Sequence, residues 1–176
     1  MSARSPHEAD STGDSIDRSP ARLSAALAIG AAVIALATVG TTSLVSFSLA
    51  AIGTATVAGG IVASNRGLVT AGAVVLFVGT LAAGVADTSA IRLLVATGGA
   101  VFAWDVGRAA VDVGVQLGAG ADTMDLELVH AGASLLVIVL SGGVGYVLFQ
   151  TAAGGQPVSA VVALLIAGTL LSLTLE

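Results

Sequence analysis

Residues 104–130 read WDVGRAAVDVGVQLGAGADTMDLELVH, and this stretch is the one long charge-bearing interruption between the first hydrophobic segment of the chain and the last. Before it, apolar runs long enough to cross a bilayer follow a polar tail, and after it two more such runs follow. Because the stretch separates these runs, it decides how many there are, in which direction each crosses, and which face could meet a soluble partner.

The composition is that of a membrane protein built from helices. The chain is 56% hydrophobic and only 10% charged, with a mean hydropathy of +1.01, whereas soluble domains carry roughly 25% charged residues. It has 23 glycines and few aromatic residues, a mixture that favours helices packed through small side chains. We therefore predict an all-α, polytopic membrane helix bundle that lies in the cell membrane and has the lipid bilayer as its first partner.

Charge and residue types exclude several functions. The net charge of −5 argues against nucleic acid as a partner. The chain has no cysteine, so it has no disulfide and no thiolate metal site. All six basic residues are arginines, and without a lysine no phosphate-binding P-loop can form. No order of residues typical of a hydrolase is present, so we expect no enzymatic activity, no catalytic residues, no bound metal and no cofactor.

The N-terminal residues 1–21 form a polar tail. They alternate acidic residues with serines and hold little apolar surface to bury, so we expect a disordered cytoplasmic tail, with a recruitment segment as the functional alternative. The tail is long and acidic, unlike the short positive start of a signal peptide. Residues 22–176 are expected to form one integral membrane domain.

Six spans are predicted within this domain, because one crossing needs about 20 residues and small polar breaks divide the longer apolar runs. The expected spans cover residues 23–39, 44–63, 68–86, 90–104, 128–149 and 158–175. The arginines then indicate the orientation. With the tail inside, five of the six lie on the cytoplasmic side and only Arg92 lies outside, as the positive-inside bias predicts. Both termini are therefore expected in the cytoplasm.

The segment 105–118 is predicted to be an amphipathic helix that extends the fourth span at the cytoplasmic interface. At 100° per residue, Asp105, Arg108 and Asp112 lie on one face, where the arginine can reach both carboxylates. Insertion at the bilayer centre would cost roughly 3 kcal/mol for each charge, so we place the three residues at the interface. A solvated face is favoured over a proton or ion relay. The helix is expected to lie on the membrane surface or to dock on the bundle.

A second face of the same segment carries glycines. Gly107, Gly114 and Gly118 form one seam, and each glycine inside a helix costs about 1 kcal/mol relative to alanine. Close contact with another helix is the best explanation for such a seam. The seam and the charged face together are the predicted partner-docking residues.

Glu127 and His130 have the Glu-x-x-His spacing that di-iron bundles use twice. Only one copy is present, and the only other histidine is His7 in the tail. We therefore predict an interfacial Glu127–His130 pair in place of a metal site. Asp125 and Glu127 also fall in the first turns of the fifth span, where the helix dipole favours negative charge.

Three short segments carry a resemblance to a known family. Trp104–Arg108, Gln116–Gly118 and Glu127–Leu135 resemble an uncharacterised family of multispanning membrane proteins from halophilic archaea, defined only as a domain of unknown function. The acidic, lysine-free composition also resembles halophilic proteins. The resemblance implies an accessory role in a cell-surface or maturation system, because such proteins are encoded near MoxR-type ATPases and transglutaminase-like membrane proteins. It implies no role for any single residue.

Two functions remain open on this reading. The first is a membrane scaffold or accessory subunit that docks other membrane or membrane-associated proteins, including an ATPase-containing complex, through its cytoplasmic helix. The alternative is a small transporter or channel, for which a 3+3 arrangement of six spans would be typical. No charged residue falls in the middle of an expected span, which favours the first. The sequence gives no oligomeric state.

Overall fold

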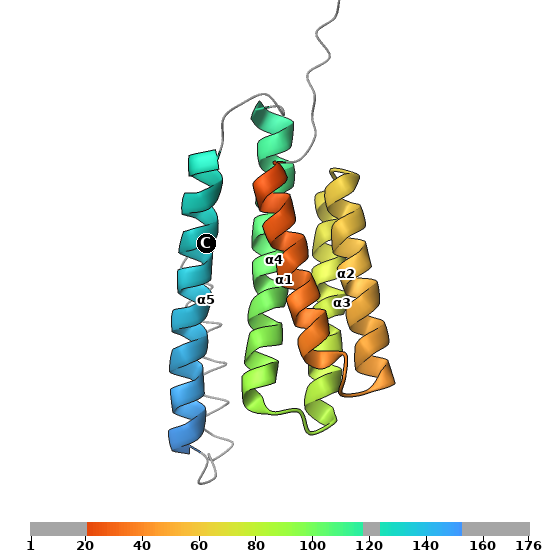
Figure 1. Cartoon of the computed structure of the whole chain (residues 1–176), viewed down its shortest axis with the longest axis vertical. Coiled ribbons are helices and arrows are strands. Elements are labelled where there is room, and N and C mark those ends of the chain that lie inside the picture. Colours follow the sequence, from red (N-terminus) through yellow and green to blue (C-terminus); the bar gives the residue numbers. More distant parts are fainter. Residues whose placement is uncertain (1–20, 118–123, 153–176) are drawn as a thin grey trace, which may run out of the picture.

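Five helices make up the part of the chain that the structure describes. The computed structural model describes residues 21–117 and 124–152, and no strand occurs within them. The helices are α1 (Arg22–Val39), α2 (Leu44–Val62), α3 (Arg66–Val85), α4 (Ala90–Leu117) and α5 (Met124–Ala152). They stand side by side, with successive helices running in opposite directions (Figure 1). All five are long and apolar enough to cross a membrane, so the all-α class is confirmed.

The first three helices follow the predicted apolar runs closely. Each of α1, α2 and α3 begins and ends within two residues of the expected bounds. Helix α2 begins after Ser43, whose side chain accepts a hydrogen bond from the amide of Ser46, and α3 begins after Asn65, which caps the amide of Leu68 at 3.1 Å. These short polar side chains satisfy amides that have no partner within the helix, which explains why both turns fall at the polar breaks.

The second half of the chain departs from the prediction. The expected span 90–104 and the expected helix 105–118 form a single uninterrupted helix, α4. Five membrane-length helices are described, not six. The sixth expected span, 158–175, lies outside the described residues, as do the N-terminal tail and Gly118. Helix α5 begins at Met124, four residues before the predicted start of the fifth span, and both Asp125 and Glu127 lie in its first turn as expected.

The closest helix packing joins α2 and α3, and glycines make it possible. A Cβ atom on Gly53 would lie 2.5 Å from the amide nitrogen of Leu76, and one on Gly72 would lie 2.5 Å from that of Val57. Both neighbours are backbone atoms, which cannot turn away as a side chain can. Glycine therefore lets the two backbones approach to a distance that no other residue permits.

Helices α1 and α4 are the centre of the bundle, because each of them packs against the other four helices. The core around them joins Ala28 of α1, Val57 of α2, Val69 of α3 and Val106 of α4. Among the described residues, helix α5 packs along α4 and the adjacent edge of α1, and none of its membrane-length window is buried. The molecule is thus a packed unit of four helices with a fifth attached along one side (Figure 1).

Candidate functional site

The glycine seam of α4 packs against this chain's own helices. A Cβ atom on Gly107 would lie 3.1 Å from Val69 and 3.5 Å from Ala28, and Gly114 is buried. The neighbouring apolar face is buried as well, since Val106 and Ala110 are fully covered. Of the two placements left open by the sequence, the structure has the helix docked on the bundle. The contact inferred for the glycines is therefore intramolecular at Gly107 and Gly114.

The charged face of α4 is divided between two neighbouring helices. Asp112 forms an ion pair with Arg66, the first residue of α3. Arg108 lies over the ring of Trp104, 5.4 Å from its centroid, and the indole of Trp104 donates a hydrogen bond to the Thr70 hydroxyl at 3.3 Å. These contacts tie α4 to α3. Arg108 therefore contacts the Trp104 ring, whereas Asp112 pairs with Arg66 of α3.

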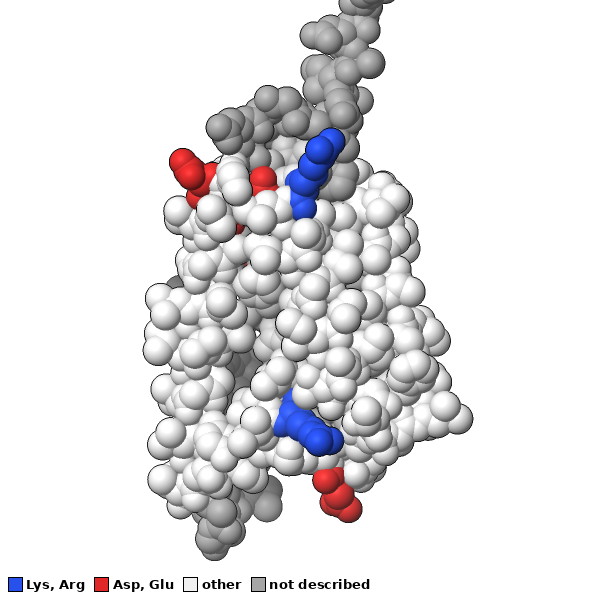
Figure 2. Space-filling model, in the orientation of Figure 1, with Lys and Arg blue, Asp and Glu red and all other residues white. Residues whose placement is uncertain are grey.

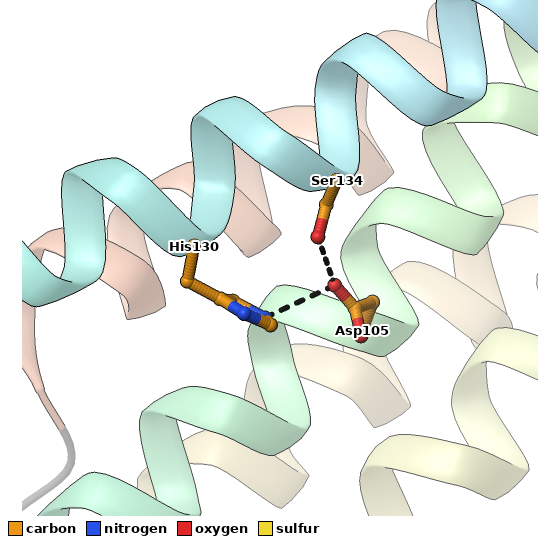
Figure 3. A network of polar contacts seen from close by, with 3 residues as sticks. All are labelled: Asp105, His130 and Ser134. Carbon is orange, nitrogen blue, oxygen red and sulfur yellow. Dashed lines mark hydrogen bonds and ion pairs between the residues drawn. The ribbon is translucent and has the colours of Figure 1, made fainter.

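Asp105 faces α5 and collects two contacts there (Figure 3). Its Oδ2 atom lies 3.1 Å from Nε2 of His130 and accepts a hydrogen bond of 2.5 Å from the Ser134 hydroxyl. His130 and Ser134 are one helical turn apart, so both side chains point to the same side of α5. The three residues form a polar cluster that joins α4 and α5, and we call it the Asp105 cluster.

The Asp105 cluster lies inside the apolar length of the helices. Asp105 is seven residues before Asp112 and thirteen after Arg92. At 1.5 Å per residue it lies about 10 Å along the helix from the Asp112 ion pair and about 20 Å from Arg92. Figure 2 shows charged side chains at the two ends of the molecule and an uncharged surface between them. Asp105 therefore lies about two helical turns from the Asp112 ion pair, and its placement at a membrane interface stays a prediction.

Glu127 caps a different helix from the one that carries it. Its Oε2 atom accepts a hydrogen bond of 2.7 Å from the backbone amide of Ser24, and its side chain is 6% exposed. Ser24 lies in the first turn of α1, where amides have no intrahelical acceptor and the helix dipole is positive. A buried carboxylate is thus held at the start of α1 by a residue 103 positions later in the chain.

The two residues of the predicted Glu127–His130 pair each contact another helix, and the pair itself stays a prediction. Glu127 contacts α1, and His130 contacts Asp105 on α4. Sequence reasoning missed Ser134, Ser24 and Arg66 as partners. Ser134 was the one with a local signal, because it follows His130 by four residues and shares its face. The other two are neighbours only in the folded chain.

The Asp105 cluster contains a serine, a histidine and an aspartate without the geometry of an activated nucleophile. In that geometry the serine contacts the histidine, which takes its proton. Here the Ser134 hydroxyl donates to Asp105. Within residues 21–117 and 124–152, no three histidine or carboxylate side chains gather closely enough to hold a metal ion. The cluster offers a negative charge and exchangeable protons at the join between two helices.

A comparison with protein families gives one match. Residues 18–172 match a family of unknown function (DUF7519). The chain belongs to this family. The match spans all five helices, and the resemblance to an uncharacterised family is confirmed to that extent. DUF7519 carries no described activity, so membership assigns no role to the Asp105 cluster or to Glu127. Neither a curated protein nor a solved structure matches the chain.

Proposed function

We propose that this chain is an integral membrane protein with its N-terminus in the cytoplasm. The five apolar helices of membrane length support insertion. Arg66 and Arg108 lie at the end of the bundle where α1 begins, and Arg92 lies in the first turn of α4 at the other end. The positive-inside bias places the arginine-rich end in the cytoplasm. With a sixth span at 158–175, the C-terminus is cytoplasmic too, and the acidic, lysine-free composition fits a halophilic archaeal source.

In this orientation the protein acts as a scaffold or accessory subunit that docks a partner on its cytoplasmic end. The observation that carries this proposal is the projection of α4 beyond its neighbours. The backbone amide of Ala21 donates to the carbonyl of Ala110 at 3.1 Å, so α1 begins level with Ala110. Residues 111–117 then continue for about 10 Å, and the end of α4 stands above the other helices in Figure 1.

The partner is a protein that recognises charge at this projecting end. Arg66 and Asp112 lie at the base of the projection, with side chains that are 48% and 34% exposed. An exposed ion pair contributes only about 0.2–1 kcal/mol to stability, so its main effect is on the surface that a partner meets. Charge complementarity at an interface sets specificity and the rate of association more than it sets affinity.

A charge swap tests this proposal without changing the net charge. In the double variant Arg66→Asp with Asp112→Arg, the ion pair is kept and the two charges exchange places. We expect a partner identified by crosslinking and mass spectrometry of native membranes to be lost from the variant, while the thermal unfolding temperature stays unchanged. The matched control is Asp87→Asn at the far end, which should retain the partner. Equal recovery from the swapped variant and the parent would overturn docking at this end.

Transport is the second candidate, and the Asp105 cluster favours it. An aspartate at the centre of a membrane helix costs about 3 kcal/mol on insertion scales, and such residues commonly mark ion or proton pathways. Asp105 and His130 lie in two membrane-length helices and contact each other. A proton flux into liposomes of the purified full-length protein, abolished in Asp105→Asn and unchanged in Asp87→Asn, would replace the scaffold with a transporter. No flux above that of empty liposomes would remove this candidate.

A further inference from the structure

An apolar groove runs between α1, α4 and α5. It lies between the Asp105 cluster and the Arg92 end of the bundle. It holds about 760 Å³, and aliphatic residues, glycines, Phe102 and Tyr146 line it. Figure 2 shows the surface hollowed where α5 stands apart from the four-helix unit. We propose that this groove binds one hydrocarbon chain of an anionic membrane phospholipid from the leaflet at the Arg92 end. The inference rests on the proposed membrane insertion and is independent of the proposed scaffold role.

The length of the groove matches one leaflet. Its lining runs from Ile91 to Phe102 on α4 and from Leu135 to Tyr146 on α5. Eleven residues of helix rise about 17 Å, and half of a hydrocarbon core of about 30 Å is about 15 Å. Next to Leu135, Ser134 of the Asp105 cluster joins α5 to α4. This contact closes the inner end of the groove. A lipid chain that enters at the Arg92 end therefore reaches the bilayer midplane and stops.

Glycines make the groove deep enough for a chain. Gly30 of α1 and Gly143 of α5 both line it, and a Cβ atom on either would meet no atom within 4 Å. These two glycines do not bring backbones together, in contrast to those of α2 and α3. Because glycine has no side chain, these two positions leave the groove wall open. Each glycine costs about 1 kcal/mol of helix stability relative to alanine. Space for a ligand explains that cost where close packing does not.

The groove has the volume of a small-molecule site. The groove offers about 760 Å³, within the range of roughly 300–1,000 Å³ typical of small-molecule sites. A flexible hydrocarbon chain fits inside.

Headgroup chemistry lies at the open end. Arg92 follows the lining residue Ile91 and makes no ion pair with any described residue. The Tyr146 hydroxyl accepts a hydrogen bond of 3.1 Å from Gln150 and keeps its own proton to donate. Guanidinium groups bind phosphate through two parallel hydrogen bonds. A phenol in the lining and an arginine next to the lining residue Ile91 therefore match a phosphate headgroup above a hydrocarbon chain.

Native mass spectrometry of the full-length protein tests the inference. The protein is reconstituted in vesicles of equal parts phosphatidylcholine and phosphatidylglycerol, and the lipids that stay bound after mild detergent extraction are identified. We expect one retained phosphatidylglycerol. Gly30→Leu and Gly143→Leu should each lower retention about tenfold, the equivalent of ~1.4 kcal/mol. Gly145→Leu, on the same helix with equally open space around it and outside the groove lining, should leave retention unchanged.

A second pair of variants tests the headgroup. Arg92→Gln should remove the preference for phosphatidylglycerol over phosphatidylcholine, whereas Arg22→Gln at the other end should keep it. Equal retention in Gly143→Leu and Gly145→Leu would overturn the inference. So would a disulfide from Gly143→Cys to a cysteine placed in 158–175, or to Gly143→Cys of a second copy, because the groove would then be covered by protein. The chain has no native cysteine that could confuse this result.

Discussion

Asp105 shows how one residue joins separate parts of this protein. Its carboxylate accepts the Ser134 hydroxyl and contacts His130, and these are the closest polar contacts between α4 and α5. Glu127 adds the only other described side-chain hydrogen bond from α5 to another helix, at the start of α1. All three lie in the first four turns of α5. Within the described residues, the polar contacts from α5 to other helices therefore all lie in that half of the helix.

Removal of the Asp105 carboxylate should loosen α5. In Asp105→Ala both His130 and Ser134 lose a partner, and one hydrogen bond contributes about 0.5–1.5 kcal/mol. The reporter is a disulfide between Gly98→Cys on α4 and Ile138→Cys on α5, where a Cβ atom on Gly98 lies 3.0 Å from the isoleucine side chain. We expect the rate of disulfide formation to fall about tenfold. Asp87→Ala is the control, and equal rates in both variants would contradict a joining role.

Loss of the Glu127 carboxylate should destabilise α1. A hydrogen bond to a charged group contributes about 1.5–3 kcal/mol, and the carboxylate also meets the positive end of the α1 dipole. Glu127→Ala should therefore lower the free energy of unfolding in detergent by about 2 kcal/mol. Glu127→Gln, which keeps an oxygen acceptor for Ser24, should lose less. Asp125→Ala, an exposed neighbour, serves as the control. If the glutamine and alanine variants lost equal stability, the acceptor oxygen would not be the cause.

At the scale of elements, two kinds of glycine have opposite effects. Gly53 and Gly72 permit backbone contact between α2 and α3, whereas Gly30 and Gly143 along the groove leave open space. The sequence shows only that both helices and the groove walls contain glycine. Which kind a given glycine belongs to depends on the neighbour that packs against it, and this neighbour comes from another helix.

Gly72→Ala and Gly59→Ala should therefore change stability in opposite directions. A Cβ atom on Gly72 would lie 2.5 Å from the amide nitrogen of Val57, so α2 and α3 would have to separate. Overpacking of this kind costs typically 1–3 kcal/mol. A Cβ atom on Gly59 meets nothing within 4 Å, and alanine gains about 1 kcal/mol of helix propensity there. Thermal unfolding followed by circular dichroism in detergent measures both, and a stabilised Gly72→Ala would show that the helices do not touch at this point.

At the scale of the whole molecule, the face shown in Figure 2 has charged side chains at its two ends and an uncharged middle. That division matches a bilayer, because the distance from Arg92 to Asp112 along α4 is about 30 Å, the thickness of the hydrocarbon core. In the proposed orientation, the positive-inside bias puts the arginine-rich end of the bundle in the cytoplasm.

Reporter fusions should locate each end. An enzyme that is active only in the cytoplasm should work when fused after Asn65, between α2 and α3, and fail when fused after Thr42 or Asp87. An enzyme that is active only outside should give the reverse pattern. The inverted pattern at all three positions would contradict the proposed orientation, while leaving the helix arrangement unchanged.

The apolar runs, the polar breaks and the cap residues determined the helices by themselves. The length of an uncharged run and the presence of Ser43 or Asn65 before it are local properties, so α1, α2 and α3 were predicted to within two residues. Helix α5 begins one turn earlier than the predicted span, because the acidic turn before residue 128 is already helical.

Only the tertiary structure decided what the charged and glycine residues of α4 do. A helical wheel places Asp105 and Asp112 on one face, yet Asp105 contacts α5 and Asp112 pairs with the first residue of α3. The wheel describes one helix, and these contacts depend on how far each neighbouring helix extends and on its distance from α4. The glycine seam was recognised as a contact surface from sequence, but its partner, the chain's own core, could be found only once the five helices were placed together.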